Sequence, residues 1–157
     1  MITKEVYATL AEKYIDTVWR VAFGYVKNPS DADDITQNVF CALLKNRKDF
    51  DSEEHARNWL IRVTVNECKK WFRSPWRRIV PFEEYAAGLE FRSPQSRQLL
   101  QAVMELPVKY RMPLYLHYYE GYTTEQIAQL LKIPKGTVCT NLSRGRAMLK
   151  DQLKEDL

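Results

Sequence analysis

The sequence predicts an all-α protein made of two small helical domains joined by a linker. Gly and Pro together account for 12 of the 157 residues, so few positions interrupt a helix. Apolar residues recur at helical spacing, and no strand-like alternation persists. We expect a three- to four-helix bundle in residues 1–74, a linker in residues 75–93, and a four-helix domain with a helix-turn-helix in residues 94–157.

Capping and breaking residues delimit the helices of the first domain. Asn28-Pro29 ends the first helix, and Ser30 with Asp33 forms a capping box for the second. An acidic loop at residues 50–54 precedes the third helix. The predicted helices span residues 4–27, 30–45 and 55–73.

The pattern breaks at residues 74–94, which hold three prolines and one glycine. The aromatic side chains of this segment indicate that it docks onto another surface. Ser93-Pro94 then provides a helix start with Pro at the first helical position. Pro113 lies either in a first turn or inside its helix, where it removes one backbone hydrogen bond. The predicted helices span residues 94–105, 107–119, 124–131 and 135–154.

Charge separates along the chain, although the net charge is only +4. Residues 31–56 carry a net charge of −4, and residues 57–78 carry +6. Residues 132–150 hold five bases and no acid. Two basic segments far apart in the sequence indicate two contacts with a polyanion, whereas the alternative is that both are solvated faces.

Several classes of function find no support in the sequence. The three cysteines show no CxxC spacing, the two histidines lie far from them, and no Gly-rich phosphate loop occurs. We therefore predict no metal, no cofactor and no catalytic residue. No run approaches the ~18 apolar residues of a membrane span, and the charged N-terminus does not match a signal peptide. These features predict a cytoplasmic chain that does not insert into a membrane.

The strongest local pattern is a helix-turn-helix near the C-terminus. Thr123 and Gln126 form a capping box, and a turn follows at residues 132–136. One buried stripe is marked by Val138, Leu142, Gly145 and Leu149. The opposite face carries short donors and a guanidinium, which suit base edges in a major groove. We assign to this DNA contact Lys135, Thr137, Thr140, Asn141, Ser143, Arg144 and Arg146.

The predicted third helix presents a second candidate DNA surface. With Leu60 at the centre of its buried face, amides and cations fall on one outward stripe, and Trp59 lies at the edge of that stripe. Such a face suits nucleic acid, including unstacked bases. The alternative is a surface helix with a core tryptophan. The residues assigned here are Asn58, Trp59, Arg62, Asn66, Lys69 and Arg73.

The predicted second helix shows apolar side chains among carboxylates on a side away from its core face. This combination indicates a protein partner. The alternative is that Phe40 belongs to a broad core. The residues assigned to the partner surface are Asp34, Gln37, Phe40 and Leu44.

Three segments in this order, residues 31–46, 58–73 and 106–149, resemble the extracytoplasmic-function sigma factors of bacteria. These are the minimal two-domain members of the primary sigma superfamily. The resemblance implies that the first half binds core RNA polymerase through Asp34, Gln37 and Phe40 and opens the promoter −10 element through the third helix. The loop at residues 50–55 would capture a flipped base. The second half would read the −35 element.

The resemblance also implies further partners and some departures. Members of the family commonly pair with an anti-sigma factor, and the polymerase performs the bond chemistry. An acid often stands where this chain has Asn38, and an Asp is common at Lys70. Two cations that the family often shows at Cys139 and Asn141 are absent, which alters the expected −35 sequence preference.

Three other functions are compatible with parts of the pattern. A helix-turn-helix transcriptional regulator would bind duplex operator DNA without core polymerase, usually as a symmetric dimer. A helical adaptor would bind only proteins and would not depend on Arg144. An enzyme would depend on His117 or Cys68.

Overall fold

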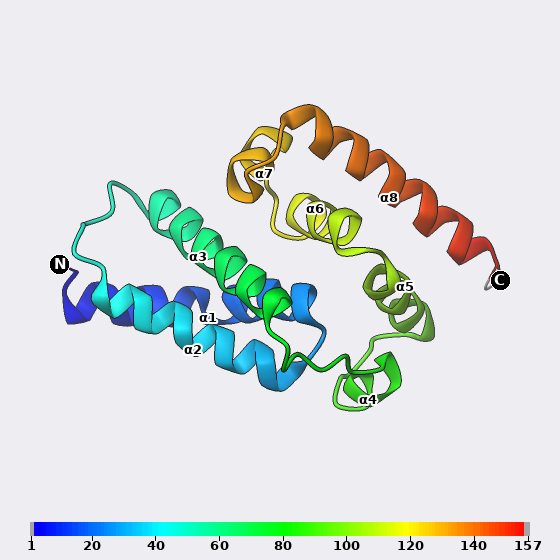
Figure 1. The fold of residues 1–157 in the computed structure, drawn as a ribbon, viewed down its shortest axis with the longest axis horizontal. Helices are drawn as coiled ribbons and strands as arrows, with labels where there is room; N and C mark the ends of the chain where they lie inside the picture. The colour runs from blue at the N-terminus through cyan, green and yellow to red at the C-terminus, as the bar shows by residue number, and fades with distance from the viewer. Residues whose placement is uncertain (1, 156–157) are drawn as a thin grey trace. The chain divides into compact units, whose positions relative to one another are not determined.

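The computed structural model describes residues 2–155, in which eight helices and no strand occur (Figure 1). The all-α prediction is therefore confirmed. The chain divides into two compact units, one ending at Ile79 and the other beginning at Val80. This division lies inside the segment that the sequence analysis assigns to the linker.

The first unit consists of α1 (Lys4–Val26), α2 (Pro29–Lys45) and α3 (Glu53–Arg73), and α1 packs against both other helices. The predicted N-cap of α2 is wrong by two residues. Asn28, not Ser30, is the N-cap, because its side chain accepts a hydrogen bond from the Asp31 amide at 3.2 Å. Pro29 then occupies the first turn, where a helix requires no amide donor.

Buried and half-buried polar side chains join the three helices of this unit. The Tyr14 hydroxyl on α1 donates to Oε1 of Glu53 on α3 at 2.7 Å, and the Trp71 indole on α3 donates to Oδ2 of Asp31 on α2 at 2.6 Å. Burial, reinforced by the hydrogen bond to Glu53, raises the pKa of Tyr14 to about 12. These contacts fix the rotation of α3 and therefore which of its residues face water.

The second unit begins with a short helix that the sequence analysis does not predict, α4 (Phe82–Ala86). Tyr85 and Ala86 are buried. Arg97 of the next helix forms an ion pair with Glu83 at 2.6 Å and lies 5.2 Å from the ring centroid of Phe82. The aromatic side chains of the predicted linker thus attach its second half to the C-terminal unit.

The remaining helices of this unit are α5 (Pro94–Glu105), α6 (Val108–Tyr118), α7 (Thr124–Leu131) and α8 (Lys135–Glu155). The predicted capping box of α7 is present, with the Gln126 amide 3.2 Å from Oγ1 of Thr123 and the Thr123 amide 2.9 Å from Oε1 of Gln126. Lys132 ends α7 in the left-handed region at φ 56°. Pro113 lies inside α6, so the second of the two predicted placements holds.

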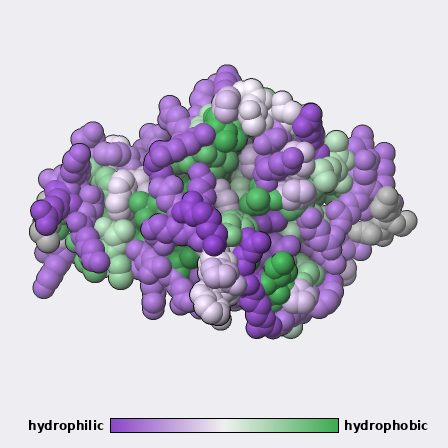
Figure 2. All heavy atoms as spheres, in the orientation of Figure 1, coloured by the Kyte–Doolittle hydropathy of each residue, from purple (hydrophilic) through white to green (hydrophobic). Residues whose placement is uncertain are grey.

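No helix within residues 2–155 is both long enough and apolar enough to cross a membrane. On the face shown in Figure 2, apolar residues gather in small areas separated by hydrophilic side chains.

Arg111 joins α6 to the end of α5 in the second unit, and a substitution at Arg111 tests this contact. Its buried guanidinium donates to the carbonyl oxygens of Leu106, at 2.7 Å, and Met104, at 3.3 Å, at the end of α5. Arg111→Met leaves these carbonyls without that donor, and we expect the unit to lose about 2–3 kcal/mol of stability. Amide hydrogen exchange of peptides from α5 and α6 measures the loss. Lys109→Met, which removes an exposed cation from the same helix, is the control; unchanged protection in Arg111→Met contradicts the assigned role.

Candidate nucleic-acid interface

The helix α8 is oriented by a buried stripe that packs on α6 and α7. Val138 is fully buried, and Leu142 is 3% exposed. A Cβ atom built on Gly145 would lie 2.7 Å from Cδ1 of Leu114 and 3.4 Å from Cβ of Tyr110, so only glycine permits this approach without a shift. The opposite face is exposed, as the periodicity predicts. It presents Lys135, Thr137, Thr140, Ser143, Arg144 and Arg146.

Asn141 is the exception among the residues assigned to this face. Its side chain is only 9% exposed, because it lies three residues after Val138 and four before Gly145, on the buried stripe itself. Asn141 therefore does not share the exposed face of α8 with the other assigned residues. Thr140 is exposed, but its hydroxyl donates to the Gly136 carbonyl at 2.9 Å, which leaves its lone pairs for an external donor.

Two tyrosines of α6 lie beside the arginines of α8. The Arg146 guanidinium donates to the Tyr118 hydroxyl at 2.7 Å and lies 6.0 Å from the centroid of that ring. Lys109, and after it Arg144, hydrogen bonds to the Tyr110 hydroxyl and lowers its pKa. Neither tyrosine is among the residues predicted from the sequence, although each lies four residues from Leu114, which lies close to Gly145. The hydrogen bond to Tyr118 restricts how the Arg146 guanidinium points.

An ion pair joins the two helices of the helix-turn-helix. Nζ of Lys135, at the start of α8, lies 2.5 Å from Oε1 of Glu125 on α7. The hydrogen bond from Lys135 lowers the pKa of the Glu125 carboxyl to about 2. Glu125 in turn raises the pKa of Lys135. The ammonium at the start of α8 is thus already held by a carboxylate that competes with any external anion.

The basic face of α3 is narrower than the sequence predicts. Asn66, Lys69 and Arg73 are exposed. Asn58 and Arg62 are half-buried, because the buried stripe is centred between Leu60 and Ile61 and not on Leu60 alone; it comprises Ala56, Leu60, Ile61, Thr64, Val65 and Cys68. Oδ1 of Asn58 is buried and has no hydrogen-bond partner in the part of the chain that the structure describes.

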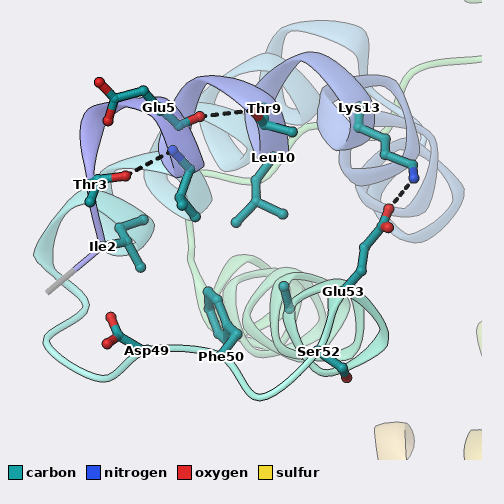
Figure 3. Close-up of a pocket in the computed structure, with 12 residues that line it drawn as sticks. Ile2, Thr3, Glu5, Thr9, Leu10, Lys13, Asp49, Phe50, Ser52 and Glu53 are labelled. Carbon is teal, nitrogen blue, oxygen red and sulfur yellow. Dashed lines mark hydrogen bonds and ion pairs between the residues drawn. The ribbon is translucent and has the colours of Figure 1, made fainter.

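A cavity of about 600 Å³ lies between the start of α1 and the loop that leads into α3 (Figure 3). Leu10, Phe50 and Ala56 give it an apolar floor, and the ion pair between Lys13 and Glu53 closes one side. The Phe50 ring lies 5.6 Å from the Trp59 ring, centroid to centroid. Trp59 is thus packed against the loop and is half-buried. This agrees in part with the alternative interpretation, in which the tryptophan belongs to the core.

Only some of the residues assigned to the partner surface of α2 are exposed. Asp34 and Gln37 are exposed, and Leu44 is 52% exposed. Phe40 is 6% exposed and lies edge-on to the Tyr7 ring, with the centroids 6.4 Å apart. Phe40 therefore belongs to the core of the bundle, and its assignment to an exposed partner surface is wrong.

Comparison with known proteins places both units in one family. The family profile described as Sigma-70 region 2 matches residues 10–78, and that described as Sigma-70, region 4 matches residues 96–149. The ECF RNA polymerase sigma factor SigW of Bacillus subtilis is 26% identical over 97% of this chain and 91% of its own length. The RNA polymerase sigma factor SigV of the same organism is 29% identical over 99% of this chain and 96% of its own length.

The chain belongs to the sigma-70 family, as an extracytoplasmic-function sigma factor. Sigma factors of this family bind core RNA polymerase and promoter DNA, and this chain directs transcription initiation. It is not an enzyme.

Two solved structures share the fold of this sigma factor. The sigma factor RpoE from Bartonella quintana, crystallised with the anti-sigma factor NepR, has a TM-score of 0.76 and 19% identity, covering 99% of this chain and all of that chain. CnrH, in complex with the cytosolic domain of CnrY, has a TM-score of 0.74 and 22% identity, covering 99% of this chain and 92% of that chain.

The ion pair between Glu125 and Lys135 predicts an unusual titration in this sigma factor. Because the folded pKa of Glu125 is lowered from 4.5 to about 2, the stabilisation by the pair is complete above pH 4.5 and is lost as the pH falls toward 2. Carbon-13 NMR of the Glu125 carboxyl follows this directly. In Lys135→Gln the pKa of the carboxyl should rise toward its ordinary value, although the backbone hydrogen bond at Glu125 still lowers it. A Glu125 that titrates identically in both proteins would show that the pair does not form.

Proposed function

We propose that α8 reads the duplex −35 element of the promoter in its major groove. The observation that carries this proposal is the separation of the two sides of α8, with Val138 and Leu142 buried and a row of short polar side chains and guanidinium groups exposed. Thr137, Thr140 and Ser143 are short enough to approach base edges. Arg144 and Arg146, held by the tyrosines of α6, suit contacts with phosphates or guanine.

The proposal for the −10 element rests on α3 and the loop before it. Asn66, Lys69 and Arg73 present an amide and two cations on an exposed face, which suits the backbone of an unpaired strand. The cavity beside Phe50 lies at the start of the same helix and is large enough for a planar base. Unstacking a base costs a few kcal/mol, roughly, and binding in an apolar cavity offsets this cost.

For core RNA polymerase, we assign the exposed face of α2. Asp34, Gln37 and Leu44 form this face, and Phe40 supports it from within the bundle. Carboxylates around an apolar side chain suit a basic helical partner surface. As a sigma factor the chain would act in the cytoplasm, where the polymerase works.

An anti-sigma factor is a further proposed partner. Two similar structures were solved with such a protein or with a cytosolic domain of a second protein bound. A protein that covers the α2 face or the α8 face would block polymerase or promoter binding.

Transcription with purified components tests the proposed function as a whole. Core RNA polymerase with this chain should make abortive transcripts from a promoter selected by the reconstituted holoenzyme, and core enzyme alone should not. Binding to duplex DNA that is equally strong without core enzyme, with no stimulation of initiation, would favour the alternative of a conventional helix-turn-helix regulator.

Substitutions on α8 test its assigned face. Arg144→Ala should weaken recognition of the −35 element by about 1–3 kcal/mol. Lys154→Ala removes the same charge from an exposed site about 15 Å further along α8 and should have little effect.

Asn141, which is buried on the same helix, provides a contrasting variant. Asn141→Ala should lower thermal stability more than it lowers promoter affinity, because its side chain lies on the buried stripe. The measurement is holoenzyme binding to fluorescent promoter fragments with intact or randomised −35 sequence. Equal losses for Arg144→Ala and Lys154→Ala would contradict the assignment of this face.

A further inference from the structure

The short segment between α3 and α4 places a tryptophan in solvent. Trp76 is 89% exposed, the largest exposed fraction among the large hydrophobic residues that the structure describes, and Ile79 is 76% exposed. A tryptophan gains more than most side chains from burial. The exposure of this indole therefore indicates a role in contacting something outside the chain.

Hydrogen bonds hold the backbone around Trp76 against the first unit. The Trp76 amide donates to Oγ of Ser74 at 3.2 Å, and the Asn28 side chain donates to the Arg78 carbonyl at 3.4 Å. Arg77 folds back so that Nη1 donates to the Phe72 carbonyl at 2.6 Å, with its guanidinium 5.9 Å from the Phe72 centroid. The indole is thus presented from a backbone with fixed attachments on both sides.

The charges next to Trp76 along the sequence are of one sign. No Asp or Glu occurs between Glu67 and Glu83, and Glu67 is already paired with Lys70 at 3.1 Å. Lys69 and Arg73 are exposed and lie one turn apart on α3, so their Cβ atoms are about 6 Å from one another. Arg73 precedes Trp76 by only three residues. A flat aromatic surface beside a row of cations is the combination that binds single-stranded nucleic acid.

We propose that the Trp76 indole stacks on an unpaired base of single-stranded DNA whose phosphates are held by Lys69 and Arg73. This inference rests on the proposed binding of an unpaired strand by α3, and it extends that site past the end of the helix. The positive charge favours a nucleic acid. An acidic protein surface is the competing occupant, and the experiment distinguishes the two.

The full chain, alone, is titrated against fluorescein-labelled single-stranded dT20 and against a duplex of equal length at low salt. Trp76→Ala should weaken binding of dT20 about tenfold, the effect of losing one stacked base, and should leave the duplex unaffected. Trp76→Tyr, which retains an aromatic face, should bind within about threefold of the unsubstituted chain. Ile79→Ala, a change at another exposed apolar residue of the same segment, should bind dT20 normally.

The double variant Lys69→Ala/Arg73→Ala tests the underlying site separately. If it loses dT20 binding while Trp76→Ala does not, the stacking inference is overturned and the proposed single-strand site stands. If neither loses binding, both are overturned. A Trp76→Ala chain that binds dT20 normally but has lost affinity for core RNA polymerase would assign the indole to a protein surface instead. Because Trp76 is almost fully exposed, none of its substitutions is expected to unfold the chain.

Discussion

The packing of α8 on α6 and α7, with Val138 and Leu142 buried and Gly145 close to Leu114, is the constraint on which the C-terminal unit depends. This packing fixes the rotation of α8. That rotation turns Asn141 inward and the short polar residues outward. It also brings the hydroxyls of Tyr110 and Tyr118 to the two arginines that flank the glycine. The packing of this stripe therefore determines which residues of α8 are exposed.

In the N-terminal unit, too, contacts between helices determine which residues are exposed. Its core is fixed by apolar packing and by hydrogen bonds from Tyr14 and Trp71 to carboxylates on neighbouring helices. The exposed C-terminal half of α3 is cationic, whereas the exposed face of α2 carries Asp34. One unit thus offers separate surfaces of opposite charge. If polymerase holds both units at one promoter, as proposed, the contacts of each would raise the effective concentration of the other, so modest individual affinities would suffice.

The all-α fold class and the buried stripe of α8 could be predicted from the sequence, because helical periodicity and capping residues are local signals. The error at the start of α2 is local, and the others arise where a nonlocal contact decides. Asn28 replaces Ser30 as the cap because Pro29 fits the first turn. Phe40 is buried because the start of α1 covers it with Tyr7. The short helix α4 could not be predicted because it is too short to show helical periodicity in the sequence. It is stabilised by contacts with α5 such as the one between Glu83 and Arg97.

The most direct measurement of where α8 lies uses the cysteines of the chain. Cys139 is exposed on α8, Cys41 is exposed on α2, and Cys68 is buried. In Cys41→Ser holoenzyme, an iron chelate attached to Cys139 should cleave promoter DNA within the −35 element. The same chelate on Cys41 in Cys139→Ser holoenzyme should leave that element intact. Cleavage from Cys139 confined to the melted region, or no cleavage from an active holoenzyme, would contradict the reading of −35 DNA by α8.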